Sequence, residues 1–397
     1  MSQDSTALRW NAPTEIPVAG SFDVVVAGGG IAGAAAALAA ARCGATVCIL
    51  EREYMSGGLS TLGLVWCYLP LCDGNGHQVS GGISEELLRL SIENGTGSIP
   101  ECWERNDDID RRKNIRFQTE FNPATLAINL DKALTASGVT IRYGSIVCDV
   151  IRNGASIEAL VAKEKEGFRA IQGKCFLDAT GDADICAFAK EETIERSDNR
   201  LAYWQYFTDG RALDRQESQV PLFGKLPDGE KVFSGIRTDD IVDFCMEGRK
   251  RIASIDIAAG NRVPILIPSI PQFRMSRRLV GRSTLFPSDE GKWCDDAIGI
   301  IADWRFKGKV YAVPYGILLP KHTDNLWVAG RCVSADESAG DTVRSIPACA
   351  VFGQAAGTAA ALAAKMQIAS YRLPITILQE NLRSNSVILD RRLVEID

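Results

Sequence analysis

Three glycines and one glutamate have the types and the spacing of a nucleotide-binding site. Gly28, Gly30 and Gly33 form a GxGxxG pattern after the apolar run FDVVVA, and Glu51 ends the next apolar run, TVCILE. The first glycine permits a tight turn, the second lets the backbone approach a pyrophosphate, and the third lets helix and strand pack closely. Glu51 would accept hydrogen bonds from ribose hydroxyl groups. A glycine-rich turn without a ligand is the structural alternative, and the acidic residue argues against it.

The motif alone leaves FAD and NAD open, because both present the same adenosine diphosphate moiety to such a unit. The segment MSGGLSTLG favours FAD, since two adjacent glycines and two hydroxyl side chains suit an extended dinucleotide. Besides the residues above, we expect the cofactor to contact the start of the first helix and the loops after the second strand, namely Ile31, Ala32, Arg52, Gly58, Ser60 and Thr61.

Three later segments resemble the FAD-dependent oxidoreductases that share a glutathione-reductase type of FAD domain. They are CFLDATGDADICAFA (175–189), QFRMSRRLVG (272–281) and the long segment from DNLWVAGRC to GTAAALAA (324–364). The resemblance covers roughly residues 20 to 365 and points to the single-chain kind without iron–sulfur clusters. It implies FAD held also by Val147, Thr180, Gly181, Asp182, Gly330, Arg331, Asp341 and Ser345. Because the chain has only two histidines, we expect this FAD to be bound non-covalently.

Arginines are the natural groups to position a substrate beside such a cofactor. Arg274, Arg277, Arg331 and Arg344 lie in the matching segments, and a guanidinium fork can hold a carboxylate, a phosphate or a developing oxyanion. Salt bridges between two domains are the alternative role for any one of them. We expect Arg344 and Arg274 to be the catalytic arginines.

For proton transfer the chain offers only two histidines. His322 precedes the strand that leads to Gly330 and is the catalytic candidate, whereas His77 lies in the loop CDGNGHQ and looks exposed. Tyr311 and Tyr315 could act as phenolic acids, with core aromatic residues as the alternative.

Other chemistries lack their motifs. Twelve cysteines form no CxxC pair and do not cluster with histidine, so we expect no metal site. The four residues between the cysteines of CYLPLC argue against a disulfide reductase. A P-loop, a GxSxG elbow and a second GxGxxG are also missing, which removes phosphoryl transfer, hydrolysis and a separate NAD(P)H domain.

The elements that would position these residues alternate between apolar strands and helices. Helices are predicted for residues 81–93 with Ser84 as the cap, for residues 122–137 with Asn122 as the cap, and for residues 349–366. The pattern predicts an α/β fold, in which a discontinuous, doubly wound Rossmann-like FAD domain carries an inserted, antiparallel β-rich substrate domain. The predicted boundaries are an arm (1–20), the FAD domain (21–82, 115–195 and 311–373), a helical cap (83–114), the substrate domain (196–310) and a tail (374–397).

Composition sets the broad class. Of 397 residues, 46% are hydrophobic and 24% charged, which is typical of a globular protein, and a net charge of −6 gives no footprint for nucleic acid. The apolar stretch from 24 to 41 is broken by three glycines, so we expect a buried strand and helix and no membrane span. Scattered cysteines without a recognisable signal sequence favour a cytoplasmic protein, and the composition permits a homo-oligomer.

We therefore expect an FAD-dependent oxidoreductase that transfers a hydride between a small organic substrate, an alcohol, amine or acid, and flavin N5. Its electron donor or acceptor is not readable from the sequence. Two alternatives remain at this point, an NAD-dependent dehydrogenase and a flavin-binding redox sensor or partner subunit without turnover.

Overall fold

The computed structural model describes residues 15–105, 108–210, 212–220, 225–257 and 262–395. Strand β1 (Val18–Ala27) begins before Phe22, so the predicted arm is too long, and its part up to residue 14 lies outside the described residues. The extra residues of β1 pair through their backbone with β8 (Gly167–Asp178). Val18 is 55% exposed, and residues 18–21 show no apolar pattern. The start of the strand could therefore not be predicted from the sequence.

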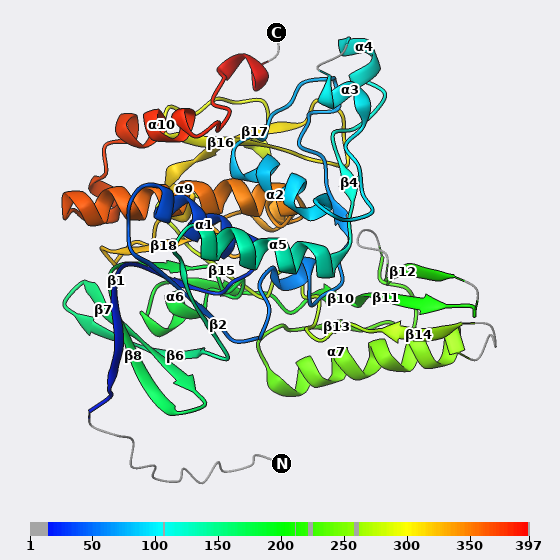
Figure 1. Ribbon diagram of the computed structural model, residues 1–397, viewed down its shortest axis with the longest axis horizontal. Coiled ribbons are helices and arrows are strands. Elements are labelled where there is room, and N and C mark those ends of the chain that lie inside the picture. The colour runs from blue at the N-terminus through cyan, green and yellow to red at the C-terminus, as the bar shows by residue number, and fades with distance from the viewer. Residues whose placement is uncertain (1–14, 106–107, 211, 221–224, 258–261, 396–397) are drawn as a thin grey trace.

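A seven-stranded sheet forms the centre of the fold (Figure 1). Its parallel part runs from β5 (Thr140–Tyr143) through β2 (Val47–Glu51) and β1 to β8. On its edge away from β1, β8 has two partners. β7 (Ser156–Glu164) pairs with its first half, and β18 (Leu326–Val328) pairs in parallel with its last residues. β6 (Ile146–Asn153) completes an antiparallel ribbon with β7. The predicted parallel α/β fold is confirmed.

Two parallel helices, α1 (Ile31–Arg42) and α9 (Ile346–Met366), cover one face of this sheet (Figure 1). A Cβ at Gly353 would lie 2.2 Å from the Ala32 carbonyl oxygen, and one at Gly357 would lie 2.0 Å from that of Ala36. Glycine is therefore required for this close approach of the two helices. The register also means that α9 starts about 9 Å before α1 does, six helical residues at 1.5 Å each.

Three further helices flank this pair, α2 (Ile83–Ile92), α5 (Pro123–Ala136) and α10 (Ile375–Ser384) (Figure 1). The short helix α6 (Asp184–Phe188) packs against β6 and β8. The segment that the sequence assigned to a helical cap contains α2 and two short helices, α3 (Glu101–Glu104) and α4 (Ile109–Arg112). The short strands β3 (Cys67–Tyr68) and β4 (Thr119–Glu120) pair with each other antiparallel.

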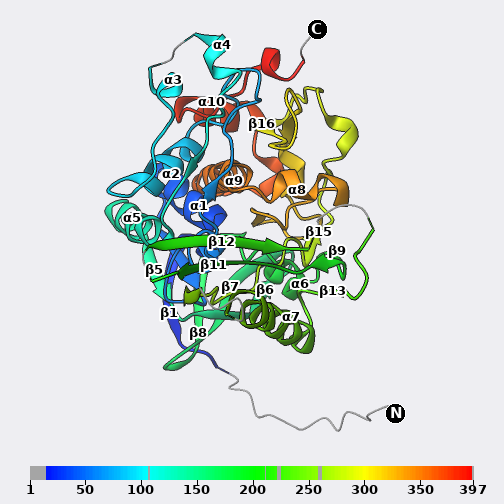
Figure 2. The ribbon, with the colours of Figure 1, turned by 90° about the vertical axis from the view of Figure 1, so that its right-hand side faces the viewer.

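An antiparallel lobe stands across the starting ends of α1 and α9 (Figure 2). Its main sheet has the order β12 (Leu213–Gln219), β11 (Ala202–Thr208), β14 (Val263–Leu266), and a short pair joins β10 (Asn199–Arg200) to β13 (Val232–Phe233). The helix α7 (Thr238–Arg251), which the sequence analysis missed, closes its core through Phe244. We call β10 to β14 with α7 the antiparallel lobe.

Two strand pairs connect the lobe's sequence to the central domain. β15 (Arg277–Leu279) pairs with β9 (Thr193–Glu195), and β16 (Ala297–Ala302) pairs with β17 (Val310–Pro314) and packs on α9. The second pair crosses the predicted boundary at residue 310. The domain boundaries stay predictions.

Two helix starts differ from the predicted ones. Gly82, and not Ser84, caps α2, because the Ser84 hydroxyl donates instead to the Pro347 carbonyl oxygen 3.2 Å away. Helix α9 begins at Ile346 and not at Cys349, since Ser345 caps it by accepting from the Ala348 N–H at 3.3 Å. The second correction brings the helix start next to Arg344.

In the part of the chain that the structure describes, one helix, α9, is long and apolar enough to cross a membrane by length and composition. Its most apolar window is 83% buried inside the protein, as in the core helix of a globular domain.

Candidate functional site

The glycine loop after β1 has a different constraint at each glycine. Gly28 has a φ of +98°, and a Cβ there would lie 2.4 Å from the Ala179 carbonyl oxygen. A Cβ at Gly33 would lie 1.9 Å from the Gly28 oxygen, so Gly33 lets α1 approach the loop. A Cβ at Gly30 would meet nothing within 4 Å. Gly30 thus leaves open space where a ligand can approach the backbone.

Glu51, the last residue of β2, links the glycine loop to the segment that follows β2. Its carboxylate accepts from the Gly29 N–H at 2.6 Å and from the Glu53 N–H at 2.9 Å. Although only 7% exposed, it lines the cavity described below. One carboxylate therefore fixes the glycine loop and still faces the space that a ribose would take.

The turn at Gly57 and Gly58 closes the loop from the other side. The Gly57 N–H donates to the Gly29 carbonyl oxygen at 2.8 Å. Thr61 donates to the Ser56 carbonyl oxygen at 2.7 Å, so its hydroxyl braces this turn, while Ser60 lines the cavity.

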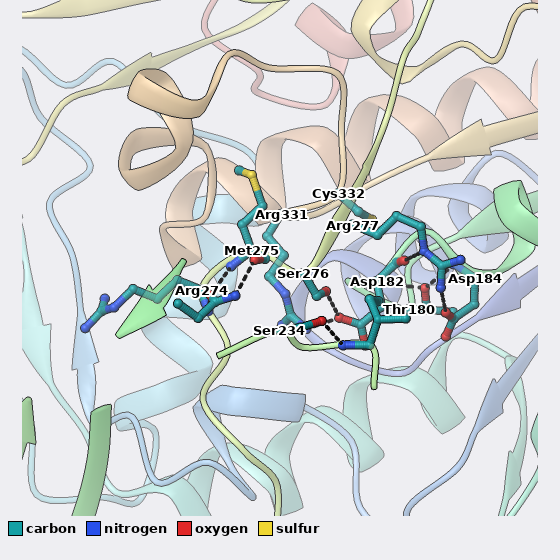
Figure 3. Close-up of polar contacts among 12 residues, drawn as sticks. Thr180, Asp182, Asp184, Ser234, Arg274, Met275, Ser276, Arg277, Arg331 and Cys332 are labelled. Carbon is teal, nitrogen blue, oxygen red and sulfur yellow. Dashed lines mark hydrogen bonds and ion pairs between the residues drawn. The ribbon is translucent and has the colours of Figure 1, made fainter. Parts of the chain in front are cut away.

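The ATGD segment after β8 is held by arginines of neighbouring segments (Figure 3). Arg331 donates to Asp182 at 2.8 Å, and the Ser276 hydroxyl donates to the same carboxylate. Arg277 donates to Asp184 at 2.9 Å and to the Asp182 carbonyl oxygen at 3.0 Å. Arg277 and Arg331 thus make the inter-segment salt bridges that the sequence left as their alternative role.

Three carboxylates meet in this segment, and their protonation differs. Burial raises the pKa of Asp184 to about 6, and the charges of Asp178 and Asp182 add to this effect. Burial also raises the pKa of Asp178. Burial disfavours ionised Asp182 as well, but the charge of Arg331 and the hydrogen bond from Ser276 outweigh it and lower the pKa of that carboxyl.

The start of α9 and the short helix before it, α8 (Gly340–Val343), carry the last group of predicted residues. Gly330, two residues after the end of β18, has a φ of +100°. Arg344 donates through Nε to Asp341 at 2.7 Å, and Arg305 donates to the same carboxylate at 3.1 Å. Asp341 therefore orients Arg344 at the place where the positive end of the α9 dipole lies.

One cavity of about 510 Å³ connects these parts. It is bounded by the carboxyl ends of β1, β2, β8 and β18, by the start of α9 and by the antiparallel lobe. Of the predicted site residues, sixteen line it: Gly28, Gly30, Ile31, Ala32, Glu51, Arg52, Gly58, Ser60, Val147, Thr180, Gly181, Arg274, Gly330, Arg331, Arg344 and Ser345. Gly33, Thr61, Asp182 and Asp341 lie behind this surface and brace it.

His322 does not belong to this group. It is an exposed residue of the loop before β18, where its N–H donates to Glu191 at 3.1 Å. The cavity lies at the carboxyl ends of the strands and this loop at the amino end of β18, so we do not retain His322 as a catalytic residue. Tyr315 is a core residue whose hydroxyl donates to the Ser370 carbonyl oxygen at 3.0 Å.

The aromatic wall of the cavity was not predicted from the sequence. Trp204 from β11, Phe273 before β15 and Trp304 after β16 line it, together with Cys67 and Cys349. A closely spaced aromatic run was visible in the sequence around Trp204. Only the pairing of β11 tells which of its two faces turns toward the cavity.

The donor set and the shape of the cavity fit a flavin dinucleotide. The open space at Gly30 admits a pyrophosphate, Glu51 faces the ribose position, and the dipole of α9 can offset negative charge on a ring placed at its start. The fold and the site thus define a Rossmann-type, FAD-binding enzyme.

The comparison with protein families agrees with this class. Residues 23–220 and 266–382 match the family described as FAD dependent oxidoreductase, so the chain belongs to that family. Its cofactor is FAD, and its members are enzymes. Neither the NAD-dependent alternative nor a sensor without turnover is retained.

The chain is similar to solved structures at low sequence identity, and one of them, with a TM-score above 0.5, shows the same fold. p-Nitrophenol 4-monooxygenase from Pseudomonas putida DLL-E4 is 11% identical with a TM-score of 0.52, and the match covers 95% of this chain and 90% of that one. L-Proline dehydrogenase from P. horikoshii is 12% identical with a TM-score of 0.44, covering 94% of this chain and all of that one. No curated protein matches the chain in sequence.

Proposed function

We propose that this FAD-dependent oxidoreductase transfers a hydride between a small organic substrate, an alcohol, amine or acid, and its flavin. The observation that carries the proposal is the single cavity that runs from the glycine loop to Arg274, Arg344 and the antiparallel lobe. A substrate bound against these arginines would share one enclosed space with the cofactor. When bound, FAD supplies the redox chemistry, since its N5 accepts or returns a hydride.

The protein's own residues would bind and orient. Arg344, held by Asp341, and Arg274 would position the substrate, which brings the reacting atoms together without further chemistry from the protein. The aromatic wall would exclude water from the reacting end. The start of α9, with its cap Ser345, would stabilise negative charge that develops near it.

Non-covalent binding of FAD is part of the proposal. Both histidines lie in the described residues, and neither lines the cavity. Burial raises the pKa of Cys349, a cavity residue, to about 12, so its thiol is a poor nucleophile for attachment. The cytoplasm is the proposed location, supported by twelve free cysteines. A homo-oligomer and the absence of nucleic-acid and membrane partners remain predictions.

Anaerobic mixing tests the proposed chemistry. The purified, FAD-loaded protein is mixed with panels of alcohols, amines and hydroxy acids, and loss of the visible flavin absorbance is followed. We expect at least one class to bleach the flavin, and reoxidation by the matching carbonyl or imine product would show that the transfer is reversible. Bleaching only by a nicotinamide cofactor would contradict the proposal. The nicotinamide would then be the hydride donor, and the reduced flavin would next react with oxygen.

A further inference from the structure

The reacting end of the cavity combines cationic and aromatic side chains. Because α9 starts before α1 does, Arg344 lies beyond the glycine loop, away from the nucleotide end. Arg274 lines the same cavity from the segment before β15. Trp204, Phe273 and Trp304 make up the aromatic wall around them.

Arg344 is fixed in orientation by a chain of ion pairs. The Asp341 carboxylate contacts Nε of Arg344 at 2.7 Å and Nη2 at 2.5 Å. Asp341 is also paired with Arg305, which Asp303 holds through contacts of 2.8 Å and 2.7 Å. Within the residues that the structure describes, these contacts leave the Nη1 side of Arg344 without a protein acceptor. A guanidinium held in this way presents one planar face to a ligand.

The surroundings make that face suited to an anion on an apolar molecule. Phe273 is buried, and Trp204 packs edge-on against Trp66 with ring centroids 4.2 Å apart. Apolar walls exclude water and strengthen a charge-assisted hydrogen bond. They also favour binding of an aromatic or aliphatic body next to the charged group. A free inorganic anion would gain nothing from such walls.

We propose that the substrate of this enzyme is an organic carboxylate. Arg344 and Arg274 would bind its carboxylate, and Trp204 and Trp304 would contact its aromatic or aliphatic body. The planar, two-oxygen carboxylate matches a single guanidinium edge. This inference rests on the proposed function and narrows its substrate class from alcohols, amines and acids to carboxylates.

Three probe molecules that share a phenyl ring and differ in their polar head group test the inference without turnover. The FAD-loaded protein is titrated with benzoate, benzamide and phenyl phosphate, and the shift of the flavin absorption spectrum is followed. We expect benzoate to bind at least about tenfold more tightly than benzamide, which is the discrimination that one charge-assisted contact provides. Added chloride should weaken benzoate binding and leave benzamide binding unchanged.

Variants then assign the contact. Arg344→Met should weaken benzoate binding by about tenfold or more and change benzamide binding by less than about twofold. Arg344→Lys, which keeps the charge and the bulk, should recover part of the loss and serves if Arg344→Met does not fold. Asp341→Asn should give a smaller loss, because it releases the orientation of Arg344. Arg89→Met, at an exposed arginine of α2 outside the cavity, is the matched control and should bind like the wild type.

Several outcomes would overturn the inference. Equal binding of benzoate and benzamide would do so, as would tighter binding of phenyl phosphate or an equal effect of Arg344→Met on all probes. Loss of FAD from both Arg344 variants would place Arg344 in the cofactor site and also refute it. These outcomes differ from failure of the proposed function, in which no organic compound bleaches the flavin while carboxylate selectivity can still be measured.

Discussion

At the residue scale, single carboxylates fix the loops that a cofactor needs. Glu51 accepts from two backbone N–H groups and faces the cavity at once. Asp182 joins Ser276 and Arg331, which come from two different segments of the chain. Charged residues that would be costly to bury alone are thus kept in place by several donors each.

Substitution of Glu51 tests this dual role. Glu51→Gln should weaken FAD binding by about tenfold, since a neutral amide replaces a charged acceptor worth about 1–3 kcal/mol. Titration of the apoprotein with FAD, followed by flavin fluorescence, gives the dissociation constant. The control is Glu158→Gln, because Glu158 is an exposed residue of β7 that does not line the cavity. Equal loss in both variants would contradict the assigned role.

The raised pKa of Asp184 predicts a pH dependence of stability. A carboxyl whose pKa is about 6 in the folded protein and 3.8 when unfolded binds more protons when folded, so its contribution to stability falls as pH rises from about 4 to 6. Asp184→Asn should remove this fall, on the order of 1–2 kcal/mol after allowance for solvent screening of a side chain that is 33% exposed. Urea unfolding at pH 4.5 and pH 7 measures it. A wild type and a variant with the same pH profile would argue against the shift.

At the scale of elements, the close pairing of α1 with α9 sets the width of the site. Gly353→Ala should destabilise the protein by about 1–3 kcal/mol, because a Cβ there overlaps the Ala32 carbonyl oxygen. Chemical unfolding measures the change. Gly248→Ala in α7 is the matched control: its Cβ would lie 3.7 Å from Tyr203, so we expect it to be neutral or stabilising. If both substitutions had the same effect, helix propensity and not packing would be the cause.

Local pattern predicted those elements whose burial follows a simple period. The β1–α1–β2 unit and helix α5 were predicted, and Asn122 caps α5 as expected by accepting from two N–H groups. Helix α7 was missed because its region was assigned to antiparallel β-structure, although Ile241, Phe244 and Gly248 recur at helical spacing and face the core of the lobe. The aromatic wall was missed because the face of Trp204 depends on strand pairing.

At the scale of the whole molecule, the cofactor cavity connects the central domain and the antiparallel lobe. Removal of FAD should therefore lower the melting temperature, and adding it back should restore the value in proportion to the logarithm of FAD concentration. Limited proteolysis of the apoprotein should cleave first in the lobe. Differential scanning fluorimetry with and without FAD measures the first effect. An unchanged melting temperature would mean that FAD does not bridge the two parts.

The two partners of β8 have a consequence for how the protein is made. β7 reaches β8 through a short hairpin, whereas β18 and α9 come from much later in the chain. The hydrogen bond from the Ile83 N–H to the Gln354 side chain joins residues that are 271 positions apart, so it too can form only late in synthesis. During synthesis on the ribosome, the glycine loop emerges long before the helix that completes its pocket. Non-local closure of this kind slows folding, so the nascent chain must wait for its last quarter before it can hold the flavin.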